Sequence, residues 1–208
     1  PQDEVIFPAP YWVSYSEMVK MCGAVPVPVL PEDGTFYPRI QDIEQVFTSY
    51  TKAIIINSPN NPTGAVYSRE FIRDVVDFAQ KKGVYLIMDD IYHRLVFDGV
   101  EWVNVFDYAQ DLDDHSKIIV INGVSKQYAM TGFRIGWAVA SKKLIEVMRI
   151  LQGHQTSGPS VVMQKAAVGA LNGVQSQVEA LRVTLQNNRN VMMERLAAFN
   201  GVRASKPM

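Results

Sequence analysis

The chain has 208 residues, of which 48% are hydrophobic and 20% are charged, which is ordinary for a globular protein with a substantial core. The net charge of -1 gives no reason to expect a nucleic-acid partner, and no apolar run approaches the ~18 residues of a membrane span. One cysteine, Cys22, excludes an internal disulfide and fits a reducing, cytoplasmic compartment, and the three histidines show no metal-ligand spacing.

Short apolar runs predict six β-strands, at residues 4–7, 25–30, 52–57, 84–89, 117–122 and 133–140. Most of these runs lack polar alternation, which is typical of strands that are covered on both faces.

Helical patterns fall between and after these runs. Ser68 is expected to cap a helix that runs to about Lys82 and stops at Gly83. A second helix is expected between Ser141 and Gly153, with an apolar stripe of Leu144, Ile145, Met148 and Leu151. A long amphipathic helix is expected between about 174 and 199, with its stripe at Val178, Leu181, Leu185, Met192 and Leu196.

This alternation of strand and helix predicts an α/β domain with a largely parallel sheet. In such sheets a ligand lies just outside the carboxyl ends of the strands. The residues that follow each apolar run are therefore the first candidates for a functional site.

The segment "SPNNPTGAVYS" (58–68) follows the third strand. Two prolines and a glycine shape a tight loop, and Asn61 offers a donor and an acceptor at its mouth. Taken alone, a simple turn is the better explanation, because Asn, Pro and Gly form turns in any protein.

The segment "DDIYHRLVFDG" (89–99) follows the fourth strand. Asp89 ends an apolar run, where an ionised carboxylate is costly unless a cation or a strong donor meets it. Tyr92 follows three residues later. A carboxylate that only caps a loop or a helix explains an isolated aspartate equally well.

The segment "GVSKQYAMTGFR" (123–134) follows the fifth strand. A lysine in a water-poor pocket, such as Lys126, can lose its proton and form a Schiff base. Arg134 adds a planar, permanently charged group suited to phosphate. A solvated lysine and a surface arginine are the ordinary alternative, which fits poorly with two residues flanking apolar strands at this edge.

Together these features match pyridoxal 5'-phosphate, which needs a lysine, a carboxylate, hydrogen-bond donors and cations. The lysine binds its aldehyde, and Asp89 would keep the ring nitrogen protonated. Asn61 and Tyr92 can hydrogen-bond the phenolic oxygen and lower the pKa of the imine.

The stretches "SPNNPTGAVYS", "DDIY" and "SKQYAMTGFRIGWA" resemble the signature blocks of the class I and II aminotransferases. These are aspartate-aminotransferase-like enzymes of fold type I that use pyridoxal phosphate. The similarity extends from "PAPYWVSY" (8–15) to the long terminal helix. It implies a three-layer α/β sandwich whose mostly parallel sheet includes one antiparallel strand.

The resemblance implies roles for matching positions. Lys126 would be the Schiff-base lysine and the base that moves the Cα proton. Asp89 would pair with the ring nitrogen, and Asn61 and Tyr92 would contact the phenolic oxygen, with Asp89 and Tyr92 also counted as catalytic.

The remaining implied roles concern the phosphate, the ring and the substrate. Arg134 and Ser125 would hold the phosphate. Trp12 would stack on the cofactor ring and, with Asn61, face the substrate, although a core tryptophan is an alternative for Trp12.

Two positions depart from the commonest family pattern. Gly123 stands where many members have serine, so any phosphate contact there must come from its backbone. Asp90 stands where the family often has glutamate, and it is not expected to touch the cofactor.

The resemblance also implies that residues 1–173 are most of a cofactor-binding large domain, incomplete at its N-terminus. Residues 174–208 would form a helix that leads toward a smaller domain. The family's glycine-rich phosphate loop and its substrate-carboxylate arginine lie outside these residues, so we expect a fragment that is inactive on its own. Family enzymes are homodimers, and "HQTSGPS" (154–160) matches a segment near their shared interface.

The expected function of the complete enzyme is ping-pong transfer of an amino group from an amino acid to a 2-oxo acid. Two alternatives remain open. One is a C–S or β-lyase on the same scaffold, and the other is a non-catalytic sensor domain that only binds the cofactor.

Overall fold

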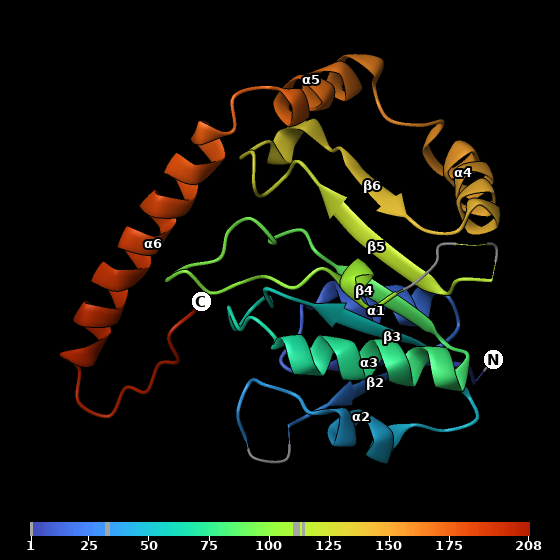
Figure 1. Ribbon diagram of the computed structural model, residues 1–208, viewed down its shortest axis with the longest axis horizontal. Coiled ribbons are helices and arrows are strands. Elements are labelled where there is room, and N and C mark those ends of the chain that lie inside the picture. Colours follow the sequence, from blue (N-terminus) through green and yellow to red (C-terminus); the bar gives the residue numbers. More distant parts are fainter. Residues whose placement is uncertain (1, 32–33, 110–112, 114) are drawn as a thin grey trace.

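The computed structural model describes residues 2–31, 34–109, 113 and 115–208 (Figure 1). Its strands are β1 (Glu4–Pro8), β2 (Val25–Val29), β3 (Thr51–Asn57), β4 (Tyr85–Asp89), β5 (Ile118–Gly123) and β6 (Gly136–Val139). Its α-helices are α1 (Ser14–Met21), α2 (Ile40–Val46), α3 (Arg69–Lys82), α4 (Lys142–Thr156), α5 (Val161–Asn172) and α6 (Ser176–Ala197), with short 3-10 turns η1 (Val105–Asp107) and η2 (Thr131–Phe133).

The strands form one sheet in the order β2-β1-β3-β4-β5-β6. All neighbouring pairs are parallel except β5 and β6, which are antiparallel. The α/β class and the mostly parallel sheet with one antiparallel strand are therefore confirmed. The prolines of "VPVPV" in β2 are tolerated because an edge strand leaves one row of N–H groups unpaired.

The carboxyl ends of the central strands are level with one another. Asn57, the last residue of β3, pairs in register with Asp89, which in turn pairs with Ile121 of β5. The loops that follow these strands consequently open at the same edge, where the sequence predicts the ligand.

Helices cover both faces of the sheet, which confirms the three layers. On one face, α2 and α3 pack on Ile6, Ile54 and Ile56 in the main core. On the other face, α1 packs Tyr15 and Val19 against residues of β1 and β3. Figure 1 shows α3 in front of the strands and α1 behind them.

The prediction of full cover on both faces is wrong for β4 and β5. Leu86 and Met88 are buried against α3, whereas Ile87, Ile119 and Ile121 on the opposite face are only half-buried. The reason is that α1 lies over β1 and β3 and does not extend across the sheet.

Helix α3 forms where the sequence predicts it. The Ser68 side chain accepts a hydrogen bond from Phe71 N at 3.1 Å, which satisfies one free N–H of the first turn. Gly83 ends the helix in the left-handed region, at φ 65°, which glycine adopts without strain.

The last strand is shorter than its apolar run. The sequence predicts a strand over 133–140, but Phe133 belongs to the turn η2 and Arg134 has φ 55°. Because a left-handed residue cannot continue a strand, β6 begins only at Gly136.

Helices α4 and α6 form, and most residues of the predicted stripes are buried or half-buried, with one exception in each helix. Helix α4 continues past Gly153 to Thr156, and Leu151 is exposed. In α6, Met192 is exposed and a charged residue, Arg189, takes a buried position. Helices α1, α2 and α5 were not predicted from the sequence.

Among the described residues, no helix combines the length and apolar character needed to cross a membrane.

Candidate active site

A cavity of about 370 Å³ opens at the carboxyl edge of the sheet. All seven candidate residues of the sequence line it: Trp12, Asn61, Asp89, Tyr92, Ser125, Lys126 and Arg134. Asp89 ends β4, and the others come from the connections after β1, β3, β4 and β5, so residues up to 122 positions apart meet in one place. Tyr15, Asn57, Ile91, Ile121 and Thr131 complete the lining.

Lys126 lies in the turn that follows β5. Its side chain is exposed to solvent, which differs from the predicted water-poor environment. The Nζ atom lies 5.8 Å from the centre of the Tyr92 ring. The amine therefore stands at the mouth of the cavity, free to meet a carbonyl group from solution.

A buried network of side chains holds this turn. The Gln127 side chain, which is 2% exposed, donates from Nε2 to Gly123 O at 3.0 Å and to Asn122 Oδ1 at 3.2 Å. Asn122 Nδ2 lies 2.9 Å from His93 Nδ1. Asn122 Oδ1 also accepts from Gly123 N at 2.7 Å, which sets the orientation of its amide, and His93 Nδ1 lies 3.0 Å from Asp90 O as well.

Burial lowers the pKa of His93, which favours the neutral ring. The network joins the turn that carries Lys126 to the segment that carries Tyr92, and the sequence patterns gave no sign of it.

Gly123 ends β5 beside the antiparallel strand. A Cβ added there would lie 2.9 Å from Ile135 O and 3.1 Å from Gly136 Cα. Since both are backbone atoms, the strand pair leaves no room for a serine side chain. Serine, the common family residue at this position, would therefore require the two strands to move apart.

Asp89 is held by two donors at the base of the cavity. Tyr15 Oη donates to Asp89 Oδ2 at 2.5 Å, and Ile91 N donates to Asp89 Oδ1 at 3.3 Å. Burial raises the pKa of Asp89, whereas these hydrogen bonds lower it. Burial and the charge of Asp89 also raise the pKa of Tyr15 well above its usual range, so its hydroxyl keeps the proton it donates.

Sequence reasoning missed Tyr15, which lies in the quoted stretch "PYWVSY" three residues after Trp12. The only available signal was its place one helical turn from a candidate residue.

Asn61 and Tyr92 face each other across the cavity. Asn61 Nδ2 lies 3.4 Å from Tyr92 Oη, a long hydrogen bond that leaves both groups able to bind a further acceptor. Asn57 fixes the position of Asn61, because its Oδ1 accepts from Asn61 N at 2.8 Å and its Nδ2 donates to Asp89 O at 2.8 Å. Asn57 was also missed by sequence reasoning.

Arg134 and Trp12 border the cavity on its remaining sides. Arg134 is exposed and donates from Nη1 to Thr131 O at 2.9 Å, which leaves its other N–H groups for an anion. Trp12 is 42% exposed and packs edge-on against Tyr15. The alternative of a core tryptophan is therefore wrong.

Two other expectations concern residues outside the cavity. Asp90 is buried and does not line it, as expected. Residues 154–160 are exposed at the end of α4 and contribute nothing to the lining, so their proposed place near an interface stays a prediction.

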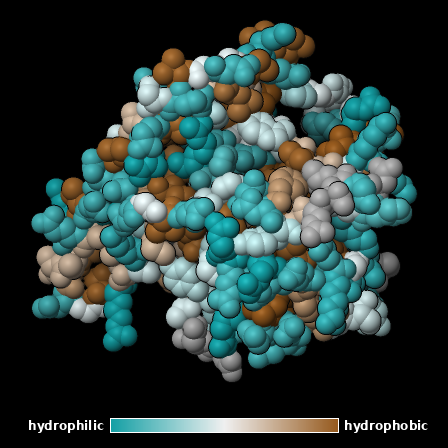
Figure 2. Space-filling view, viewed as in Figure 1, coloured by the Kyte–Doolittle hydropathy of each residue, from teal (hydrophilic) through white to brown (hydrophobic). Residues whose placement is uncertain are grey.

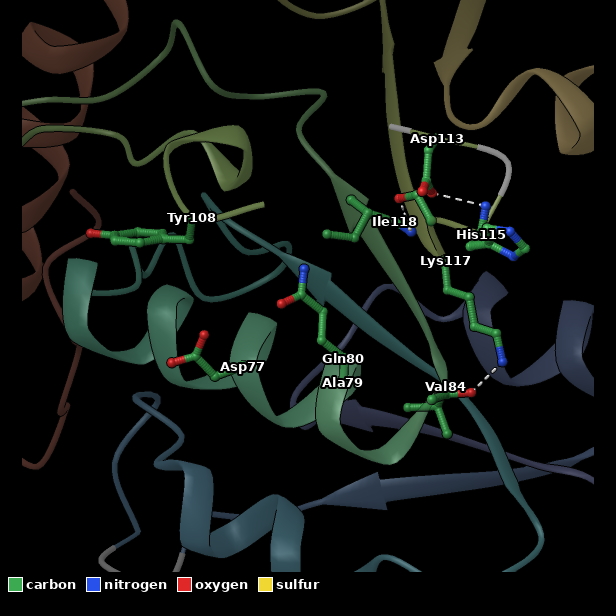
Figure 3. Close-up of a pocket in the computed structure, with 11 residues that line it drawn as sticks. Asp77, Ala79, Gln80, Val84, Tyr108, Asp113, His115, Lys117 and Ile118 are labelled. Carbon is green, nitrogen blue, oxygen red and sulfur yellow. Dashed lines mark hydrogen bonds between the residues drawn. The ribbon is translucent and has the colours of Figure 1, made fainter. Parts of the chain in front are cut away.

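A larger cavity of about 490 Å³ lies at the opposite edge of the sheet (Figure 3). It is bordered by the end of α3 and the start of β5, and Lys117 donates there to Gly83 O. Figure 3 shows Asp77, Tyr108 and His115 spread around its rim with no convergence on one point. Although Lys117, Asp77 and Tyr108 supply an amine, a carboxylate and a phenol here, these groups are spread around the rim, and Lys117 donates to a backbone carbonyl.

The groups at the carboxyl edge fit pyridoxal phosphate as a donor set. The edge offers one amine, one carboxylate held by a tyrosine, an amide–phenol pair and a guanidinium, all bordering one cavity. Among the described residues, no group of three or more acidic, histidine or cysteine side chains is arranged to hold a metal ion.

The sequence profile of the family described as "Aminotransferase class I and II" matches residues 1–207. The chain belongs to the class I and II aminotransferases. Enzymes of this family depend on pyridoxal 5'-phosphate, which agrees with the donor set at the carboxyl edge.

Similar aminotransferases come from several bacteria. The chain is 39% identical to an aspartate aminotransferase of Bacillus sp. (strain YM-2), over 99% of this chain and 52% of that protein. It is 41% identical to a probable aspartate/prephenate aminotransferase of Rickettsia bellii, over 99% of this chain and 51% of that protein.

A solved aspartate aminotransferase structure from Rhizobium meliloti has the same fold. It superposes with a TM-score of 0.92 and 36% identity, over 100% of this chain and 52% of that one. The chain thus spans about half the length of the aminotransferases that it matches.

Proposed function

We propose that the whole protein is an aminotransferase that moves an amino group from an amino acid to a 2-oxo acid in two half-reactions. The observation that carries this proposal is the single cavity at which Lys126, Asp89, Asn61, Tyr92 and Arg134 meet. The relatives named above support the same reaction class.

When bound, pyridoxal phosphate supplies an aldehyde that takes up amines and a ring that accepts the electrons of the substrate Cα–H bond. Lys126 contributes the amine that holds the cofactor covalently. As a free amine, Lys126 Nζ would act as the base that takes up and returns the proton of the substrate Cα. Its exposed position above the Tyr92 ring gives the amine room for both tasks.

The other residues hold the cofactor and set its charge. Asp89 binds the ring nitrogen and keeps it protonated, and Tyr15 holds that carboxylate in place. Asn61 and Tyr92 donate to the phenolic oxygen. Arg134, with Ser125, binds the phosphate, while Trp12 covers the ring and borders the substrate together with Asn61.

We also propose the arrangement of the whole protein. Residues 1–173 belong to the large cofactor-binding domain, and residues 174–208 lead through α6 to a smaller domain. The protein acts as a cytoplasmic homodimer. Exposed apolar side chains on α4 and α5, among them Val147, Ile150, Val161 and Val162, support a covered face in the assembled enzyme.

A lyase and a sensor domain are less well supported. The similar proteins carry the names of aminotransferases and a transaminase, and no feature of the cavity favours the other two functions. Release of ammonia and pyruvate without an oxo-acid acceptor would contradict the transfer reaction in favour of a lyase.

The test is an absorbance spectrum of the protein with pyridoxal phosphate, followed by borohydride reduction and peptide mapping. We expect a band that survives gel filtration and a reduced adduct on Lys126. The adduct should be absent in Lys126→Ala and retained in Lys165→Ala, a control on the exposed surface of α5. An adduct on another lysine would refute the assignment.

A further inference from the structure

Helix α6 carries an arginine where an apolar residue is expected. Arg189 is 8% exposed and points toward the body of the protein from a helix whose other buried residue is Val178. A guanidinium is costly to bury unless its N–H groups are paired. The groups that pair with the guanidinium therefore indicate the role of Arg189.

The main partner of Arg189 is Asp98, in the segment that follows β4. Nη1 donates to Asp98 Oδ2 at 2.9 Å and Nη2 donates to Asp98 Oδ1 at 2.7 Å, a bidentate pair. The guanidinium also lies 5.0 Å from the centre of the Phe97 ring. A second bond from the same helix reaches this segment, because Gln186 Oε1 accepts from Asp98 N at 3.1 Å.

The second partner is the segment that ends the chain. Arg189 Nη1 donates to Pro207 O at 2.7 Å, and Lys206 Nζ lies 2.8 Å from Asp98 Oδ2. Figure 1 shows this segment returning from the far end of α6 toward the carboxyl edge of the sheet. Arg189 and Asp98 thus join three separate parts of the chain.

The terminal segment in turn rests on the loop that carries Asn61. Met208 N donates to Gly64 O at 2.9 Å. The fit is close, since a Cβ added to Gly64 would lie 2.4 Å from Pro207 Cβ. Pro207 and Met208 also line a cavity of about 350 Å³ together with Asn61 and Tyr92.

Arg189 therefore holds the segment that presents Tyr92 directly, and it reaches the loop that presents Asn61 through Pro207 and Met208. Tyr92 lies six residues before Asp98, and Asn61 lies three residues before Gly64. Their own contact, at 3.4 Å, is too long to hold one segment against the other.

We propose that Arg189 is a positioning residue for the active site, which it never touches. Through Asp98 it fixes the segment of Tyr92, and through Pro207 it fixes the loop of Asn61, so that both donors converge on the phenolic oxygen of the cofactor. This proposal rests on the proposed function, because the position of Asn61 relative to Tyr92 matters only if both side chains bind the cofactor.

A first experiment needs no cofactor and measures hydrogen exchange in the protein. Arg189→Leu should speed exchange in peptides that cover 59–65 and 203–208 by roughly tenfold or more, while β3 and β4 stay protected. Arg195→Leu, on the exposed side of the same helix, is the matched control and should leave these peptides unchanged. Unchanged exchange in Arg189→Leu would overturn the proposal.

A second experiment measures the pH midpoint of the cofactor absorbance change, which would stay the same if Arg189 only stabilised the fold. With pyridoxal phosphate bound, the pH midpoint of the absorbance change should rise by roughly 0.5–1 unit in Arg189→Leu, the worth of one hydrogen bond to the phenolic oxygen. Asp98→Asn, a surface change that keeps the shape of the side chain, should shift the midpoint in the same direction. Arg189→Lys should restore part of the difference.

The two experiments distinguish a failure of the positioning role of Arg189 from a failure of the proposed function. Faster exchange with an unchanged midpoint would overturn the positioning role and leave Arg189 a stabilising residue only. Failure of the unsubstituted protein to give the absorbance band would refute the proposed function itself, and the positioning role with it.

Discussion

Asp89 and Asp90 are neighbours in the sequence with opposite environments. Asp89 faces the cavity and receives the Tyr15 hydroxyl, whereas Asp90 is buried and its Oδ1 has no hydrogen-bond partner in the described structure. Successive residues at a strand end point to opposite sides, which is enough to give the two carboxylates different chemistry.

Removing the Tyr15 hydroxyl should weaken cofactor retention. In Tyr15→Phe the Asp89 carboxylate loses its shortest hydrogen bond and its pKa rises, so less of it is ionised for the ring nitrogen. A hydrogen bond to a charged group contributes about 1.5–3 kcal/mol, which corresponds to at least about tenfold weaker binding. Equilibrium dialysis of pyridoxal phosphate checks this, with Tyr11→Phe as the control; equal affinity in both variants would contradict it.

Asp90 should make the protein less stable as pH rises. Burial, with the neighbouring charge of Asp89, raises the pKa of Asp90 from 3.8 to about 7, so the folded state binds more protons between these values. Stability contributed by the protonated form is present at low pH and lost as pH rises through about 7. The cost above that pH is at most about 4 kcal/mol.

Asp90→Asn should therefore raise the melting temperature at pH 8 and have a smaller effect at pH 5. Thermal unfolding at both values measures the difference. Asp77→Asn, at an exposed position of α3, is the control and should show no such pH dependence. Parallel melting curves for Asp90→Asn and the parent would disprove the assignment.

At the scale of the element, local sequence rules explain α3 better than they explain the later helices. Helix α3 has its serine cap, buried stripe and left-handed glycine within 16 residues, and all of them are visible in the sequence. Helix α4 has no buried residue, and α6 buries a charged residue that its apolar pattern does not predict. Arg189 is buried in α6 because Asp98 and Pro207 meet it there.

The cap of α3 allows a direct test of this difference. Ser68→Ala should lower the free energy of unfolding by about 1 kcal/mol, because Phe71 N loses its acceptor. Ser141 precedes α4 in the equivalent position but makes no cap hydrogen bond from its side chain. Urea denaturation should show a smaller decrease in the free energy of unfolding for Ser141→Ala than for Ser68→Ala. An unchanged free energy of unfolding in Ser68→Ala would contradict the role of the cap.

At the scale of the whole molecule, the apolar surface is unevenly distributed. Figure 2 shows hydrophobic side chains gathered over α5, where Val161, Val162 and Val168 are exposed. The main core lies on the other side of the sheet from α1, between the strands and α2 and α3. An exposed apolar patch of this kind marks a contact surface.

If this surface forms the contact of the proposed homodimer, a charge placed in it should weaken the dimer. Val162→Asp should move the whole protein from dimer toward monomer in sedimentation velocity, because a carboxylate is costly to bury in an apolar contact. Gln80→Asp, at an exposed position of α3, adds the same charge away from this face and is the control. A monomeric parent protein, or an unaltered dimer in Val162→Asp, would contradict the proposed use of this face.

The sequence by itself determined which chemical groups stand at the strand ends and in what order. Apolar runs and turn residues are local signals, so they predicted the strands, apart from the start of β6, and the α3 cap. The same signals placed Asn61, Asp89, Tyr92, Lys126 and Arg134 at one edge of the sheet, whereas Trp12 and Ser125 came from the family resemblance. Pairs such as Tyr15 with Asp89 and Arg189 with Asp98 were decided by the tertiary structure. Their partners lie 74 and 91 residues apart, and only the order of the strands and the course of α6 bring them within hydrogen-bond distance.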